Sequence, residues 1–380
     1  MIGTGVVPVA LSFALLKEGR GAQDIGFVFA AQTVPLILLL LLGGAAADRS
    51  RKTVMVSADL ARCLSEVVLA TLFIVSTPSL LIVMLLASVL GIGQAFSSPA
   101  LSGLMPQLTS TSNLHKANAI KASVSSAGQL IGPALAGVVI AVASPGWALY
   151  IDGASYAISA VCILLLRIPH TKSRTGESML VEVSQGWREF SSRSWLWIIV
   201  LQFGLFRMMV YGPFMVLGSV LANRSLNGAS SWALILSAQG AGSILGGLVM
   251  QQLRPTHPLR VAILATFVFA GPVTCMALGA STRVIAAASA ISGFAIAVFV
   301  TLWESTIQRE IPIEVLSRVA AYDWLGSYAL TPVGYIVGAL FAARIGIRNT
   351  LMVSATWAVL SSAVVISVSS IRRLQTDQTR

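Results

Sequence analysis

The sequence predicts an all-α membrane protein of twelve transmembrane helices, arranged as two pseudo-symmetric bundles of six helices each. Three observations carry this prediction: the composition, the length of the apolar runs and the similarity between the two halves of the chain. Of the 380 residues, 56% are hydrophobic and only 10% are charged, whereas soluble domains carry about 25% charged residues. So little charge leaves too little polar surface to cover a water-soluble globule.

The apolar runs have the length that a membrane-spanning helix requires. A helix rises about 1.5 Å per residue, so about 20 apolar residues cross a hydrocarbon core of about 30 Å. This length predicts spans at residues 1–16, 25–47, 54–75, 79–97, 119–142, 146–166, 195–219, 231–250, 260–280, 284–303, 321–343 and 349–371. The first span is short and begins at Met1. We therefore expect a first helix truncated at its amino terminus, which an upstream start codon would lengthen.

One polar stretch divides the chain into two halves. Residues 167–194 form the longest polar segment, and "SMLVEVSQGWREF" within it has apolar residues at helical spacing. We expect an amino-terminal bundle at 1–166, a cytoplasmic linker at 167–194, a carboxyl-terminal bundle at 195–371 and a cytoplasmic tail at 372–380. The halves resemble each other, since "LLGGAAADRSRKTVMV" matches "ILGGLVMQQLRPTHPLRVAI" and "LHKANAI" matches "LSRVAAY" at nearly the same offset. These matches indicate a duplicated six-span unit.

The basic residues are distributed as topology markers. The net charge is +11, but the Lys and Arg residues stand one to three at a time between apolar runs, without the basic stripe of a nucleic-acid-binding surface. Lys and Arg collect in cytoplasmic loops. Of the 25 Lys and Arg residues, the loops on one side hold only Lys17, Arg20, Arg224, Arg283, Arg344 and Arg348. The excess on the other side places both termini in the cytoplasm and the chain in the inner cell membrane, with the lipid bilayer and not nucleic acid as its partner.

The sequence lacks the residues that ATP hydrolysis and metal binding require. The chain has no GxxxxGK followed by Ser or Thr, so an ATP-driven pump would need another subunit. The three histidines lie in loops without HExxH or paired cysteines, and the three cysteines lie in apolar segments, which leaves no ligand set for a metal. We expect neither an enzyme nor a bound cofactor.

The stretch "GGAAADRSRK", residues 43–52, passes directly from small apolar residues into charges. It resembles the loop between spans 2 and 3 of the major facilitator superfamily. Gly44, Asp48 and Arg49 match that motif residue by residue, and Arg51 with Lys52 supply its basic pair, although its second Gly is absent. The resemblance implies a cytoplasmic gate that latches the inward side shut. The alternative is charge that serves only topology.

A second stretch, "GQLIGPALAG", resembles the antiporter signature of the same superfamily at Gly128, Gly132, Pro133 and Gly137. Pro removes a backbone hydrogen bond and bends the helix, while Gly lets a neighbouring helix approach closely. In the family this signature is associated with exporters. A close-packed transmembrane helix explains the same residues equally well.

Longer runs resemble one branch of the superfamily. Residues 57–75, 91–108 and 132–169 are similar to proteins of the macrolide-efflux and enterobactin-exporter type. The resemblance implies the major facilitator fold and a secondary transporter that works by alternating access. The chain departs from the superfamily at Ala87, which stands where an Arg is usual in span 4, so the proton-coupling role of that Arg does not transfer.

Charged residues inside predicted spans are further candidates, because each costs about 3 kcal/mol near the middle of a bilayer. Arg207 lies deep in span 7, which lines the cavity in the superfamily, and is expected to contact substrate, to take part in proton movement or to form a structural pair. Asp59, Arg62 and Glu66 share one face of span 3. We expect Asp59 and Arg62 to form a structural ion-pair ladder, and Glu66, which lies deeper, to carry a proton.

Charged residues near span ends complete the candidates. Trp303 and Glu304 close span 10, where Glu304 is either a gate partner for a base or an interfacial acid. Asp152 and Asp323 open spans 6 and 11, and their positions predict ordinary interfacial acids. The apolar neighbours of Arg207 would either contact hydrophobic substrates or face lipid: Phe203, Phe206, Met208, Met209 and Phe214.

These expectations converge on a secondary active transporter. The motifs favour proton-coupled efflux of amphipathic small molecules, such as drugs, macrolides or siderophores, by a monomeric protein. Two alternatives remain open at this point: an importer of a small metabolite, and a truncated membrane protein that does not transport.

Overall fold

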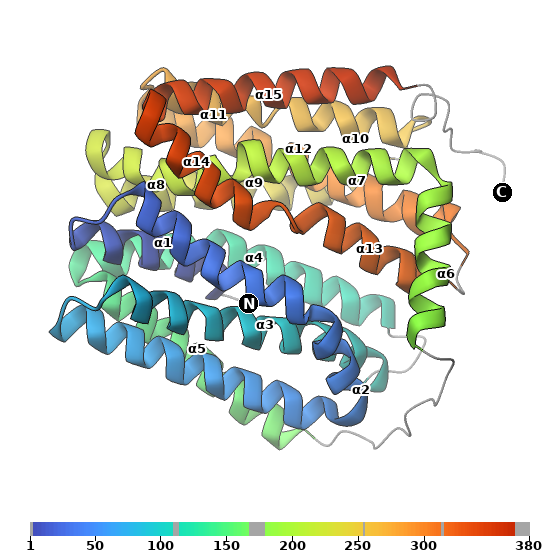
Figure 1. Ribbon diagram of the computed structural model, residues 1–380, viewed down its shortest axis with the longest axis horizontal. Helices are drawn as coiled ribbons and strands as arrows, with labels where there is room; N and C mark the ends of the chain where they lie inside the picture. Colours follow the sequence, from blue (N-terminus) through green and yellow to red (C-terminus); the bar gives the residue numbers. More distant parts are fainter. Residues whose placement is uncertain (1–2, 109–113, 167–178, 254, 313–314, 369–380) are drawn as a thin grey trace. The chain divides into compact units, whose positions relative to one another are not determined.

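The computed structural model describes residues 3–108, 114–166, 179–253, 255–312 and 315–368, and every regular element in these ranges is a helix (Figure 1). Ten of its helical segments are long and apolar enough to cross a membrane. The helix α1, Gly3–Lys17, is apolar but shorter. The predicted all-α architecture is therefore confirmed for the described residues, while the count of twelve spans stays a prediction.

The chain folds as two compact units. The first comprises Met1–Arg174 with Ala222–Ser237, and the second comprises Thr175–Leu221 with Ala238–Arg380. Besides α1, the first unit contains α2 (Ala22–Val75), α3 (Leu80–Leu108), α4 (Leu114–Val142) and α5 (Pro145–Leu165). The segment Ala222–Ser237 adds the end of α8 and the beginning of α9 to this unit.

Helix α2 folds back on itself. At Ser50 the backbone leaves helical geometry, with φ −156° and ψ 81°, and Figure 1 shows the two arms of α2 that meet at this turn. The second arm corresponds to the predicted span 54–75. Its three charged residues, Asp59, Arg62 and Glu66, set it apart from the ten apolar segments.

Small residues bring the helices of the first unit together. Gly91 of α3 packs on the backbone of Gln32 in the first arm of α2, where any side chain would overlap with the Gln32 carbonyl. Gly146 of α5 packs on the second arm, and a Cβ there would lie 2.7 Å from Cγ1 of Ile74. Such small residues let helices approach closely where van der Waals packing holds them together. Helix α3 therefore contacts both arms of α2, and α5 contacts the second.

The second unit contains more and shorter helices, two of which, α8 and α9, it shares with the first unit. They are α6 (Met179–Ser192), α7 (Ser194–Phe206), the π-helix η2 (Arg207–Tyr211), α8 (Gly212–Ser225), α9 (Gly228–Met250), α10 (Pro258–Phe267), α11 (Ala270–Ala277), α12 (Thr282–Glu310), α13 (Leu316–Tyr328), α14 (Thr331–Ile345) and α15 (Ile347–Ser367). Three predicted spans are interrupted helices. The segment Ser194–Ser225 passes through η2, Pro258–Ala277 combines α10 and α11, and Arg318–Ile345 combines α13 and α14.

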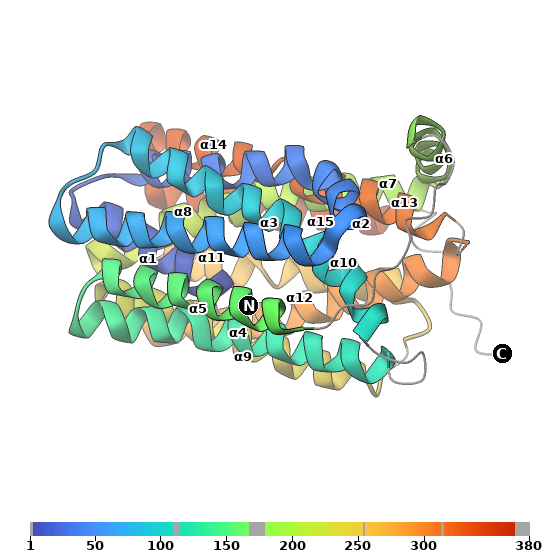
Figure 2. The same cartoon turned by 90° about the horizontal axis from the view of Figure 1, so that it is seen from below.

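The polar stretch expected as a linker contains a helix. Helix α6 lies within residues 167–194, and Figures 1 and 2 show it running across the direction of the other helices of its unit. The ring of Tyr322 in α13 lies 5.5 Å from the ring of Trp187 and 5.8 Å from that of Phe190. Aromatic packing therefore attaches α6 to α13, while residues 167–178 lie outside the described part.

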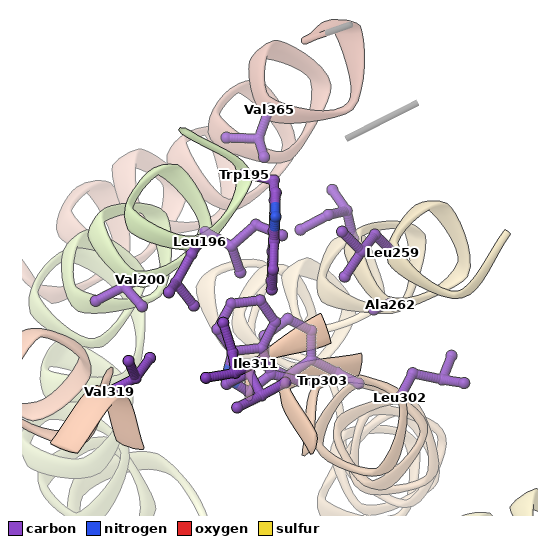
Figure 3. Packing of buried hydrophobic residues seen from close by; sticks show 14 of the residues in the cluster. Trp195, Leu196, Val200, Leu259, Ala262, Leu302, Trp303, Ile311, Val319 and Val365 are labelled. Carbon is purple, nitrogen blue, oxygen red and sulfur yellow. The ribbon is translucent and has the colours of Figure 1, made fainter. Parts of the chain in front are cut away.

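A hydrophobic core joins α7, α10, α12, α13 and α15 of the second unit. Figure 3 shows Trp195 of α7 directed at Trp303 of α12, and their ring centroids lie 5.9 Å apart in an edge-to-face arrangement. Trp303 is 7% exposed. Edge-to-face aromatic pairs stabilise beyond their buried area, so this core holds the Trp303 indole in one orientation.

Candidate functional sites

Charged side chains gather in two clusters, one in each unit. The α2–α5 cluster of the first unit consists of Asp59, Arg62, Glu66, Asp152, Tyr156 and Ser159. The α12–α13 cavity of the second unit is lined by Ile199, Val200, Phe203, Phe299, Val300, Trp303, Glu304, Asp323, Trp324, Ser327 and Tyr328. Among the described residues, no three His, Cys, Asp or Glu side chains lie where they would hold a metal ion.

Two carboxyl groups face each other in the α2–α5 cluster. Glu66 is 0% exposed and Asp152 is 1% exposed, and their side chains interact. Ser155 donates a hydrogen bond to Oδ1 of Asp152 at 3.3 Å. No donor of the described chain reaches Oδ2 of Asp152 or either carboxyl oxygen of Glu66. The expectation that Asp152 is an interfacial acid is therefore wrong.

Asp59 and Arg62 bond to α5 and not to each other. Ser159 donates a hydrogen bond to Oδ2 of Asp59 at 2.6 Å. The Arg62 guanidinium donates to the Tyr156 hydroxyl and lies 3.8 Å from the centroid of the Tyr156 ring. The predicted ion-pair ladder along one helix is thus wrong, because the i, i+3 partners turn towards the neighbouring helix.

The fit of Arg62 depends on a glycine in α3. A Cβ at Gly93 would lie 2.6 Å from Cδ of Arg62, so only glycine leaves room for the arginine stem. Arg62 also interacts electrostatically with Glu66 and Asp152. It is thus the base that Glu66 and Asp152 share.

Sequence reasoning missed the α5 side of this cluster. Asp152, Ser155, Tyr156 and Ser159 follow one another at i, i+3, i+4 and i+7, a spacing that places them on one helix face. A polar stripe of this kind inside an apolar helix indicates a partner helix with polar groups. The facing arm of α2 carries a matching polar stripe at Asp59, Arg62 and Glu66.

The structure describes only part of the predicted gate motif. The side chains of Gly44, Asp48 and Arg49 lie outside the described part, and Arg51 begins the second arm of α2. Lys52 donates hydrogen bonds from Nζ to the carbonyl oxygens of Leu164 and Leu166, at 2.7 and 2.8 Å. The last carbonyls of a helix have no partner within it and carry partial negative charge. Lys52 therefore caps the end of α5.

The antiporter-like motif lies where α4 meets α1. A Cβ at Gly5 of α1 would lie 2.6 Å from Cδ of Pro133, 2.9 Å from the Gly128 carbonyl oxygen and 3.1 Å from Cα of Gly132. Gly137 packs against Ala233 of α9. Both interpretations of the motif, a sealed path and a generic close-packed helix, require this close approach.

The α12–α13 cavity places an acid among aromatic rings. It has a volume of about 170 Å³. Trp303 donates from Nε1 to both carboxyl oxygens of Asp323, each at 3.2 Å, and Ser327 donates to Oδ1 at 3.3 Å. Asp323 is half-buried and Glu304 is exposed. Trp303 and Glu304 both line this cavity, and their expected roles stay predictions. Asp323 lines the same cavity, which its position near a span end did not indicate.

Arg207 begins η2 and is held by hydroxyl and aromatic groups. Its Nε donates to Oγ1 of Thr331 at 2.8 Å. The guanidinium carbon lies 4.0 Å from the ring centroid of Tyr328 and 4.6 Å from that of Tyr211. No acid of the described chain lies within ion-pairing distance of it. Arg207 therefore contacts Tyr328, a residue of the cavity wall, and π-helices of this kind are frequent at functional sites.

Known transporters resemble this chain over nearly its whole length. A family model described as Major Facilitator Superfamily matches residues 1–329. Macrolide efflux protein A of Streptococcus pyogenes is 24% identical over 383 residues, which cover 98% of this chain and 94% of that protein. The multidrug efflux pump Tap of Mycolicibacterium fortuitum is 23% identical over 386 residues, which cover 98% of this chain and 93% of the pump.

Solved transporter structures share the fold. The nucleoside transporter NupG matches with a TM-score of 0.73 at 14% identity, over 96% of this chain and 95% of that one. A bacterial homologue of the iron transporter ferroportin, in an inward-facing state, matches with a TM-score of 0.70 at 17% identity, over 96% and 95%. At such low identity the likeness concerns the fold alone.

Proposed function

Because the chain belongs to the Major Facilitator Superfamily, we propose that this integral membrane transporter exports amphipathic small molecules in exchange for protons. Both termini would lie in the cytoplasm and twelve helices would span the inner membrane of the cell. A monomer would alternate between inward-open and outward-open states.

The α12–α13 cavity is the observation that carries the substrate side of this proposal. Its walls combine the rings of Phe203, Phe299 and Trp324 with the carboxyl group of Asp323. Ligand sites in general pair apolar and aromatic walls with a few placed polar groups. The curated relatives are a macrolide efflux protein and a multidrug efflux pump, which supports export over import.

The α2–α5 cluster supports the proton side. Two buried carboxyl groups in contact repel each other when both are charged, and one shared proton removes that repulsion. Glu66 and Asp152 have this arrangement, with Arg62 close enough to compensate the charge when the proton leaves. We assign proton transfer to this pair, and we assign to Asp59 the task of holding α5 through Ser159.

We assign supporting roles in transport to the residues of the sequence motifs. Gly44, Asp48, Arg49 and Arg51 would form the cytoplasmic gate, to which Lys52 contributes by fixing the end of α5. The close packing at Gly128, Gly132, Pro133 and Gly137 would seal a path through the first unit. Arg207 would orient the wall of the α12–α13 cavity through Tyr328.

Efflux from energised cells tests the proposal. Cells that express the full chain are loaded with ethidium or a macrolide, and the loss of the compound is followed with and without an uncoupler. We expect uncoupler-sensitive efflux that Glu66→Gln and Asp152→Asn abolish. The matched control is Glu310→Gln, which removes an acid that pairs with Arg309 outside both clusters.

The outcomes separate the alternatives. Efflux that persists in the uncoupler, or in both carboxyl variants, would contradict proton coupling through this pair. Accumulation of a metabolite in place of efflux would support the importer. A membrane-inserted chain that moves no compound in either direction would support the non-transporting alternative.

A further inference from the structure

The carboxyl group of Asp323 is fixed in place but not neutralised. Its hydrogen-bond donors are the Trp303 indole and the Ser327 hydroxyl, and both donors are uncharged. An ionised carboxyl group accepts about four hydrogen bonds, so these donors leave part of its capacity unused. Within the described residues, no Lys, Arg or His lies within ion-pairing distance of Asp323, since the ion pairs involve Glu18, Glu189 and Glu310.

A second acid lies in the wall of the same cavity. Glu304 follows Trp303 in α12, is exposed, and interacts electrostatically with Asp323. Two acids line this cavity against one base, Arg207, which lies over the ring of the lining residue Tyr328. The excess of acid gives the cavity a negative potential, and low-dielectric walls concentrate such a potential. An anion would be repelled, whereas a cation would relieve the repulsion between the two acids.

The rest of the wall is aromatic. The Phe203 and Phe299 rings stack with centroids 5.0 Å apart and planes 5° apart, and Trp324 stacks on Tyr328 with centroids 4.4 Å apart. Aromatic faces attract cations, most strongly Trp and most of all where water is excluded. One of these rings is already used in this way, because the Arg207 guanidinium lies over Tyr328.

The volume limits what fits. The cavity measures about 170 Å³, and a cavity of about 150 Å³ is enough for one benzene ring. A whole drug-sized molecule is too large for this space. The cavity therefore accommodates one end of such a molecule, such as a ring or an alkylated ammonium group.

We propose that the α12–α13 cavity binds the positively charged, ring-sized end of an amphipathic organic amine, with Asp323 as counter-ion and the aromatic walls around the ammonium group. Glu304 attracts the cation at the edge of the site. This inference rests on the proposed export function, since it names the class of molecule that would be exported.

Equilibrium dialysis with purified full-length protein in lipid nanodiscs tests this site. The probes are benzyltrimethylammonium and benzylsulfonate, which have the same ring and opposite charge. We expect the cation to bind about tenfold more tightly than the anion. This comparison needs no variant, so it does not depend on how a mutant folds.

Substitutions then locate the binding. Asp323→Asn keeps an acceptor for the Trp303 indole but removes the charge, and we expect it to weaken cation binding about tenfold. Glu304→Gln is expected to weaken it about threefold. Glu310→Gln, on the same helix but outside the cavity, is the matched control and should leave binding unchanged.

The outcomes are separable from those of the transport test. Equal binding of both probes, or cation binding that survives Asp323→Asn in folded protein, would overturn the cation site even if proton-driven efflux is observed. Tight, Asp323-dependent cation binding by a protein that shows no efflux would support the cation site and contradict the proposed export function.

Discussion

The two clusters place the same kind of residue, an acid inside a predicted span, in opposite surroundings. In the α2–α5 cluster, Glu66 and Asp152 are 0% and 1% exposed, and glycine-packed helices fill the space around them. In the α12–α13 cavity, Asp323 is half-buried beside an open volume of about 170 Å³. An enclosed acid can exchange only a proton, whereas an acid on a cavity can meet a molecule. The packing around each acid therefore determines its task.

The largest expected effect is a separation of two activities. Glu66→Gln should abolish uncoupler-sensitive efflux and leave benzyltrimethylammonium affinity within about twofold of wild type, because the enclosed pair does not meet the cation. Asp323→Asn should weaken cation binding about tenfold. Efflux assays and equilibrium dialysis on the same two variants measure this. Equal loss of cation affinity in both variants would remove the distinction between the clusters.

The difference in packing predicts different tolerance to one added methyl group. Gly93→Ala places a methyl against the Arg62 stem and should lower the free energy of unfolding by about 1–3 kcal/mol. Ser327→Thr adds a methyl beside the α12–α13 cavity and should cost less than about 1 kcal/mol. Thermal unfolding of both variants in the same detergent compares them. A larger loss for Ser327→Thr would show that the cavity is the tighter of the two sites.

The Tyr156 hydroxyl should contribute more to the free energy of unfolding than the exposed Tyr150 hydroxyl of the same helix. Tyr156→Phe removes the oxygen to which the Arg62 guanidinium donates and should cost about 1.5–3 kcal/mol, as hydrogen bonds to charged groups do. Tyr150→Phe removes an exposed hydrogen bond with Thr71 and should cost about 0.5–1.5 kcal/mol. Equal unfolding temperatures for the two variants would argue against a stabilising hydrogen bond between Arg62 and Tyr156.

The smallest expected effect concerns Lys52. Lys52→Met removes the charge that caps the end of α5 and should lower the free energy of unfolding by about 0.3–1 kcal/mol, with a smaller effect at high salt. Lys52→Arg keeps the charge and is the control. A loss of efflux in Lys52→Met without any loss of stability would assign Lys52 to the gate and not to the helix end.

Motifs and apolar lengths were enough to predict the family and the class of fold. The match to the Major Facilitator Superfamily over residues 1–329 confirms the family resemblance, while the gate assignment of Gly44, Asp48 and Arg49 stays a prediction. The helices follow the predicted apolar runs, because span length depends on local hydrophobicity, which is visible in one sequence. The turn at Ser50 lies where the charged motif predicted the end of a span.

Burial of individual acids could not be predicted in the same way. Asp152 and Asp323 lie near predicted span ends, but distance from a loop does not determine how deeply a side chain is buried. Their surroundings are set by other helices: Glu66 comes from α2, and Trp303 comes from α12. Such contacts depend on helix rotation and neighbour choice, which hydrophobic periodicity leaves open in a segment that is apolar on all sides. Hydrophobic periodicity does not predict the π-helix at Arg207 either.

The attachment of α6 to α13 has a mechanical consequence. Tyr322, which packs against Trp187 and Phe190 of α6, is followed directly in the chain by Asp323. A displacement of α6 that rotates α13 by a few degrees would therefore turn the Asp323 carboxyl relative to the Trp303 indole. The aromatic attachment of α6 thus lies one residue away from the acid of the cavity, so a shift of α6 would reach the Asp323 carboxyl through the α13 backbone.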